Sequence, residues 1–180
     1  MQLALNMTFL IVCALCAIFD YLTFKIPNKL ILVLLALFLA RAAAFMFLPE
    51  FSEHLLYGGI ALVAGFVLYA LKIVGAGDAK FITVCILWIS QANIVLFLLA
   101  TSFAGGVIAL IYLCCSERMD LLRQRCVNKA TTYHWGKTLL AVKLSEPRLG
   151  TDRVGKGLIP YGVAIFIGVL YTSIITKGNF

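Results

Sequence analysis

The stretch Gly75-Ala76-Gly77-Asp78-Ala79-Lys80 places an acid beside two glycines, between two long apolar runs. A charge next to the hydrocarbon core of a bilayer is tolerated mainly where it lines a watery cavity or finds a partner, so Asp78 is a candidate functional residue. Gly75 and Gly77 lack a Cβ, which lets another segment or an extended substrate peptide approach the backbone closely. We therefore expect Asp78 on an accessible lip, with Gly75, Gly77 and Lys80 as supporting residues.

The composition around this stretch is that of a membrane protein. Over 180 positions, 63% of the residues are hydrophobic and 13% are charged. A soluble domain of this size could not bury so many apolar side chains. The chain is predicted to be all-α, with residues 1–180 forming one domain, a bundle of six transmembrane helices. The predicted spans cover residues 3–19, 30–48, 55–73, 81–89, 94–115 and 157–175. The fourth of these, residues 81–89, is short, so we expect it to tilt or to thin the bilayer locally.

The basic residues predict the orientation of the bundle. Residues 116–156 hold nine of the fifteen lysines and arginines, and Lys25, Lys29, Lys72 and Lys80 fall on the same side. Because basic residues near span ends favour the cytoplasm, we expect a multi-pass protein of the plasma (inner) membrane with this side facing inward. The charge suits anionic lipid headgroups better than nucleic acid, because it is spread out and accompanies no nucleic-acid-binding motif.

The remaining polar residues in or near the apolar runs have structural interpretations. Arg41 is expected to face a neighbouring helix or to extend to the interface, and His54 to be solvated in an acidic outer loop over residues 49–54. Cys13 and Cys16 lie in the first span and behave as small hydrophobic residues, so neither a metal nor another cofactor is expected. Small residues that permit close helix packing are Gly58, Gly59, Gly65, Gly105 and Gly106.

A second acid, Asp20, lies at the same predicted depth as Asp78. It ends the first span, and Pro27 and Asn28 after it suit the first turn of the next helix, so we expect them as further supporting residues of the site. Two carboxylates that approach closely cannot both ionise easily, so such a pair shares a proton near neutral pH and can hydrolyse a peptide bond. The pattern alone leaves an alternative open, in which the acids are structural or form an ion pathway, as in a small proton-coupled carrier.

Three motifs resemble the type IV prepilin peptidase family of intramembrane aspartyl proteases, over nearly the whole chain. They are Asp20-x5-Ile26-Pro27-Asn28, Gly75-Ala76-Gly77-Asp78-Ala79-Lys80 and Ile159-Pro160-Tyr161-Gly162. The resemblance implies an aspartic-type endopeptidase that removes the short basic leader of type IV pilin-like precursors at the cytoplasmic face, just before the hydrophobic helix. It also implies that Asp20 and Asp78 are the catalytic pair.

The chain also differs from the longer members of that family. Those members carry a cytoplasmic insert with paired CxxC motifs, which is associated with N-methylation, whereas here Asp20 follows the first span directly. The resemblance therefore does not extend to N-methyltransferase activity. The short form is most similar to the peptidases of tight-adherence (Flp) pilus systems, and an archaeal preflagellin-type enzyme is the related alternative.

Overall fold

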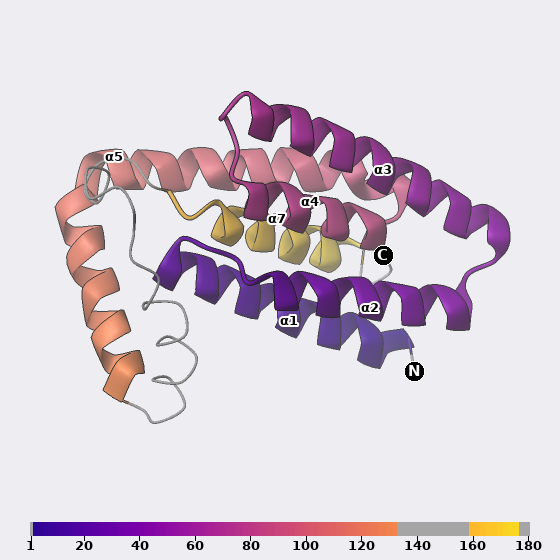
Figure 1. The fold of residues 1–180 in the computed structure, drawn as a ribbon, viewed down its shortest axis with the longest axis horizontal. Helices are drawn as coiled ribbons and strands as arrows, with labels where there is room; N and C mark the ends of the chain where they lie inside the picture. The colour runs from indigo at the N-terminus through magenta and orange to yellow at the C-terminus, as the bar shows by residue number, and fades with distance from the viewer. Residues whose placement is uncertain (1, 133–158, 177–180) are drawn as a thin grey trace. The chain divides into compact units, whose positions relative to one another are not determined.

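The computed structural model describes residues 2–132 and 159–176, and over residues 116–132 it describes the backbone together with the side chain of Arg125. Every regular element in these residues is helical, which confirms the all-α prediction (Figure 1). In chain order they are α1 (Gln2–Thr23), α2 (Asn28–Phe45), α3 (Leu48–Ala70), α4 (Ala76–Trp88), the 3₁₀ helix η1 (Gln91–Asn93), α5 (Ile94–Thr132) and α7 (Tyr161–Ile175).

Four segments of the described chain are long and apolar enough to cross a membrane: α1, α2, α3 and Gln91–Cys115. The helix α7 is apolar but has only 15 residues. With 13 residues, α4 is shorter still, about 20 Å at 1.5 Å per residue, against a hydrocarbon core of about 30 Å. The chain is thus a multi-pass membrane protein, and the fourth predicted span is indeed short.

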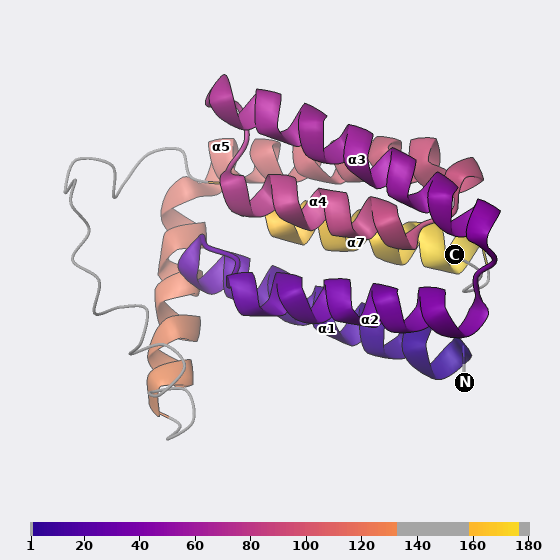
Figure 2. The same ribbon diagram turned by 45° about the vertical axis from the view of Figure 1, so that its right-hand side comes forward.

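The chain divides into two compact units, Met1–Val107 with Pro160–Phe180, and Ile108–Ile159. In the first unit, α4 packs against α2, α3 and α7, while α1 packs against α2 and α7 (Figure 2). The helix α5 begins in the first unit and continues into the second. A single domain over residues 1–180 stays a prediction.

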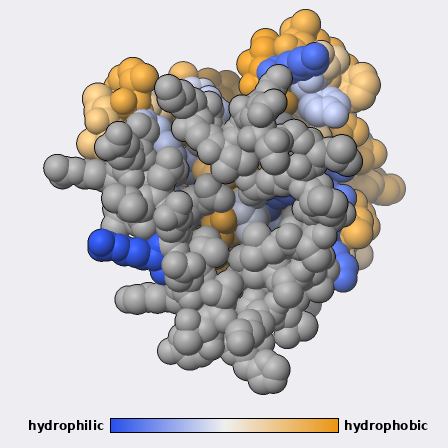
Figure 3. Space-filling view, turned by 60° about the vertical axis from the view of Figure 1, so that its left-hand side comes forward, coloured by the Kyte–Doolittle hydropathy of each residue, from blue (hydrophilic) through white to orange (hydrophobic). Residues whose placement is uncertain are grey.

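The apolar core of the first unit lies where four helices meet. Phe9 of α1, Phe38 of α2, Trp88 of α4 and Val169 of α7 are all buried from solvent. The rings of Phe9 and Trp88 stack in parallel with centroids 4.3 Å apart, which joins α1 to α4. Outside this core, large apolar side chains are exposed, and hydrophobic surface is prominent where Figure 3 shows described residues. Such a surface suits lipid.

Two of the predicted small-residue positions bring α3 and α4 together. A Cβ built on Gly58 would overlap the side chain of Leu87, and one on Gly65 would lie 3.1 Å from the Cβ of Ala79. Gly59 faces open space, so the prediction of close packing is wrong for that position. The short helix α4 is therefore in close contact with α3 along its length.

Helix boundaries differ from the predictions at three places. Residues 49–54 are not a loop, because α3 begins at Leu48 and accommodates Pro49 in its first turn. Asp20 lies inside α1, which continues to Thr23. Beyond a kink at Cys115, α5 continues to Thr132, so the first part of the predicted basic loop is helical. Residues 133–156 of that loop, and the predicted start of the last span at residue 157, lie outside the described residues.

Candidate active site

Asp20 is buried in the last turn of α1, where it meets the beginning of α7. Its Oδ2 accepts a 2.7 Å hydrogen bond from the backbone N–H of Gly162, the second residue of α7. The first N–H groups of a helix have no partner within the helix, and the helix dipole favours a negative charge there. Asp20 thus caps α7 from a distant part of the sequence.

This contact requires a glycine at position 162. A Cβ built on Gly162 would lie 2.8 Å from the Cβ of Asp20 and 2.9 Å from its Oδ2, closer than real Cβ contacts. Any larger residue would push Asp20 or the start of α7 away. Gly162 therefore allows the close approach of α1 and α7 at this point.

Asp78 is the third residue of α4, and its carboxylate folds back toward the helix start. Gly75, in an extended conformation, is the N-cap residue, and the Asp78 carboxylate lies close to its backbone. This resembles the return contact of a capping box. A Cβ on Gly75 would lie 2.9 Å from Oδ2 of Asp78, so glycine leaves room for the carboxylate.

The fold brings the two acids together. The carboxyl groups of Asp20 and Asp78 interact electrostatically. Asp20 lies against the N-terminus of α7, and Asp78 lies in the first turn of α4. A Cβ on Gly77 would be 3.6 Å from the Cβ of Ile26, so the segment between α1 and α2 also packs against the start of α4. All three sequence motifs thus meet at one end of the first unit. We call Asp20, Asp78, Gly75 and Gly162 the acid centre.

The other predicted supporting residues have less direct roles. Pro27 precedes α2 in an extended conformation, and its carbonyl accepts the N–H of Leu30, so it starts the helix as predicted. Asn28, the first residue of α2, and Lys80 are exposed. In the described part of the chain, no hydrogen bond or ion pair joins Asn28 or Lys80 to either acid.

Two residues of the site were absent from the predicted set, namely Ile26 and Gly162. Both belong to motifs that the sequence singles out, Ile26 before Pro27 and Gly162 after Pro160. For Gly162 the available signal was a glycine in the first turn of a helix that follows a proline, because such a glycine allows another segment to approach the backbone closely. Nothing local in the sequence indicates that Asp20 is its partner.

Three buried thiols lie where α1 faces α4, namely Cys13 and Cys16 of α1 and Cys85 of α4. Cys13 and Cys16 each interact electrostatically with Cys85, and Cys16 also interacts with Asp20. All three are free and buried, as expected for small hydrophobic side chains. Across residues 2–132 and 159–176, no set of three or more His, Cys, Asp or Glu side chains is arranged to hold a metal ion.

Comparison with protein families explains why the two acid motifs occur together. The profile of the type IV leader peptidase family matches residues 7–110. The chain belongs to the type IV leader peptidase family. The match contains both acids and ends before α7, so the Gly162 contact lies beyond the matched range. Comparisons with curated proteins and with solved structures gave no match. The resemblance is confirmed at the level of the leader peptidase family, and the Flp-type short form stays a prediction.

A first prediction concerns Gly77, where the side chain added decides the outcome. Gly77→Ala should be tolerated, because its Cβ would make an ordinary contact with Ile26. Gly77→Val adds two further methyl groups against Ile26 and should strongly reduce peptidase activity. Initial rates for the two variants at equal amounts of membrane-inserted protein would test this. Equal activity in both would show that the approach of Ile26 to Gly77 is not required.

Proposed function

We propose that this chain is an aspartic-type endopeptidase that removes the short basic leader of type IV pilin-like precursors, with Asp20 and Asp78 as its catalytic pair. The observation that supports this proposal best is the electrostatic interaction between the two acids in a member of the type IV leader peptidase family. The acids come from different helices; the backbone N–H of Gly162 holds Asp20, and Asp78 lies against the backbone of Gly75. Such an arrangement suits paired acid–base chemistry.

The proposed reaction uses the two carboxyl groups in opposite protonation states. One carboxylate takes a proton from a water molecule as that water attacks the scissile carbonyl carbon. The protonated partner donates to the carbonyl oxygen and later to the leaving amine, as in aspartic proteases. In Asp20, Oδ2 is engaged by the N–H of Gly162, which leaves Oδ1 for the water or the shared proton. The backbone bond from Gly162 thus orients Asp20.

The cleavage is proposed to occur at the cytoplasmic face of the plasma membrane. Lys25 follows the end of α1 closely, Lys72 follows α3, and Lys80 lies in the first turns of α4, so all three are near the helix ends that carry the acids. These lysines are exposed, and exposed basic residues at span ends favour the cytoplasmic side. The pilin precursor would then present its leader from the compartment in which it is made.

Coexpression with a candidate precursor tests the function directly. The precursor should carry a basic leader followed by an apolar helix, and a version made without the leader serves as the size standard. A shift of the full precursor to the standard on a gel, together with the new N-terminus found by mass spectrometry, is the expected result. A precursor that stays intact beside correctly inserted enzyme would contradict the proposal.

The basic segment after Cys115 is proposed to bind lipid rather than to read the leader. A basic leader and a basic segment repel each other, whereas both are attracted to anionic headgroups. Neutralising Arg123, Arg125 and Lys129 together should therefore lower cleavage only modestly in anionic liposomes, and removing anionic lipid should slow both proteins. If the triple variant fails on a basic leader but cleaves an acidic one, the segment recognises the leader instead.

A further inference from the structure

The end of α4 that lies away from Asp78 stops inside the protein. Its last residue, Trp88, and the following Ile89 are both fully buried. The last carbonyl groups of a helix lack partners within the helix, and a buried carbonyl without a partner is costly. A 13-residue helix in a bilayer therefore needs polar groups from its neighbours at this end.

Arg41 of α2 supplies one of these groups. It is only 4% exposed, and its Nη1 donates a 2.7 Å hydrogen bond to the carbonyl oxygen of Trp88. Its guanidinium also lies over the Trp88 ring, 5.1 Å from the centroid. A cation at a helix C-terminus is favoured by the helix dipole. The prediction that Arg41 faces a neighbouring helix is confirmed, and the neighbour is α4.

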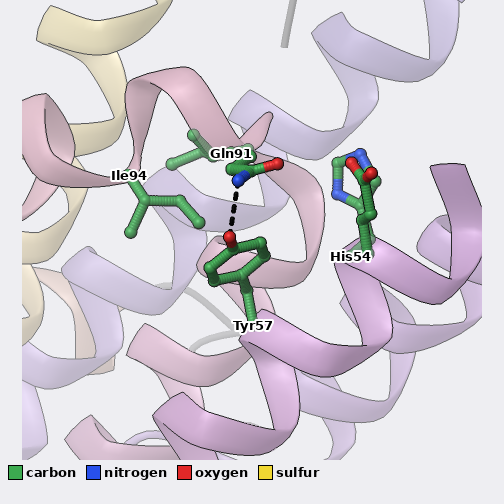
Figure 4. Close-up of a pocket in the computed structure, with 6 residues that line it drawn as sticks. His54, Tyr57, Gln91 and Ile94 are labelled. Atoms are coloured by element: carbon green, nitrogen blue, oxygen red, sulfur yellow. Dashed lines mark hydrogen bonds between the residues drawn. The ribbon is translucent and has the colours of Figure 1, made fainter.

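Two side chains of α3 hold the same region. Nδ1 of His54 lies 2.9 Å from the carbonyl oxygen of Leu87, and since that oxygen only accepts, the ring nitrogen donates. Tyr57, one turn further along α3, accepts a hydrogen bond from Nε2 of Gln91 in η1 (Figure 4). His54 is thus not the solvated loop residue that the sequence predicted. We call Arg41, His54 and the Phe9 ring stacked on Trp88 the far-end anchor.

A cavity beside the anchor explains how the arginine is tolerated there. Its volume is about 460 Å³, and its lining includes Arg41, His54, Glu50 and Glu53. The two glutamates interact electrostatically with His54, so acidic groups face the basic ones. A charge that borders a polar cavity is far less costly than one in hydrocarbon.

We propose that Arg41 is a positioning residue, which fixes the position of α4 along its axis and thereby the placement of Asp78 against Asp20. The effect on catalysis rests on the proposed function, whereas the effect on α4 does not. At the end that carries Asp78, α4 meets its neighbours through small residues, with Gly77 against Ile26 and Ala79 against Gly65. Small residues allow close helix packing but supply no directional bond, and between helices in lipid there is no hydrophobic driving force. The hydrogen bonds from Arg41 and His54 to α4 are at the opposite end of that helix, at the carbonyls of Trp88 and Leu87.

Two native thiols report the position of α4 without any peptidase assay. Cys13 of α1 interacts electrostatically with Cys85 of α4, which lies two residues before Leu87 and three before Trp88, the residues whose carbonyls are anchored. Iodine oxidises the two thiols to a disulfide and releases two protons and two iodide ions. The rate is measured in a background in which Cys16, Cys114, Cys115 and Cys126 are replaced by alanine, by mass spectrometry of the linked peptides. Disulfide formation needs the two sulfur atoms in register.

Arg41→Met is the main variant, because it keeps an apolar chain of similar length but donates no hydrogen bond. It should slow formation of the Cys13–Cys85 disulfide and reduce kcat for leader removal by about a hundredfold, the effect of a misplacement of about 1 Å, with KM little changed. Arg41→Lys should restore part of both, because its ammonium group can donate to the Trp88 carbonyl. Ser52→Ala is the matched control, since Ser52 donates its hydrogen bond to the carbonyl of Pro49, three residues earlier in α3.

The outcomes separate this proposal from the proposed function. Wild-type rates of disulfide formation and of cleavage in Arg41→Met would overturn the positioning role, as would slow cleavage at an unchanged disulfide rate. If no Cys13–Cys85 disulfide forms in the cysteine-substituted background that retains Arg41, the positioning role is also overturned, because α1 and α4 would not be in contact as described. If the enzyme cleaves no precursor but Arg41→Met slows disulfide formation, the position of α4 does depend on Arg41 and the peptidase proposal fails instead.

Discussion

Asp20→Asn and Asp78→Asn are each expected to abolish leader removal while leaving the protein in the membrane. An amide cannot exchange the proton that acid–base catalysis requires, and a positioned acid or base contributes about 10²–10⁴-fold to the rate. Either substitution should therefore remove nearly all activity, because the proposed pair works only as a unit. The amide keeps the shape of the carboxyl group, so the hydrogen bond from Gly162 to position 20 can persist. Precursor processing in inverted membrane vesicles measures the effect.

Glu50→Gln provides the matched control for both acids. Glu50 lies in the first turn of α3, beside the cavity at the far end of α4, and should be replaceable with little loss. Substantial processing by either aspartate variant would remove that residue from the catalytic pair. Equal losses in all three variants would show that carboxylates are needed for insertion and not for chemistry.

Gly162→Ala is expected to reduce leader removal by about a hundredfold with the chemistry of both acids intact. The new Cβ would lie 2.8 Å from the Cβ of Asp20 and 2.9 Å from its Oδ2, so Asp20 must move or α7 must retreat. A misplacement of about 1 Å is enough for a loss of this size. Cleavage rates at saturating precursor would show the effect in kcat.

Gly59→Ala tests whether alanine in a helix is harmful in itself. Gly59 faces open space in α3, and alanine is the better helix former, so this variant should be as active and at least as stable as the wild type. Both glycine variants should remain inserted and resist thermal unfolding in detergent. If Gly162→Ala cleaves at the wild-type rate, Asp20 does not depend on close contact with α7.

The sequence was informative wherever composition or a local motif carries the signal. The apolar runs predicted the approximate places of the helices that the structure describes, because a bilayer demands long apolar segments whose backbone bonds are internal. The residues around Asp20 and Asp78 were identified because acids are rare at such depth. The boundaries were less accurate. Pro49 is compatible both with a loop and with the first turn of α3, and the charged residues after Cys115 continue α5.

The sequence could not indicate contacts that depend on how the helices pack. Asp20 and Gly162 are 142 positions apart, and no periodicity relates them. In the same way, His54 looks like a polar loop residue until the short α4 places the Leu87 carbonyl beside it. Which groups these polar residues bond therefore depends on the lengths of the helices and on how they cross. The order of residues along the sequence does not reveal either.

The bond between Asp20 and Gly162 also bears on the order in which the protein is made. Asp20 and Asp78 both emerge from the ribosome well before α7, the last described helix. Until α7 inserts, Asp20 lacks its backbone donor, and the acid centre is incomplete. A growing chain would thus hold both acids in an unproductive arrangement during synthesis. If the two acids act as proposed, insertion of α7 would be the step that completes the acid centre.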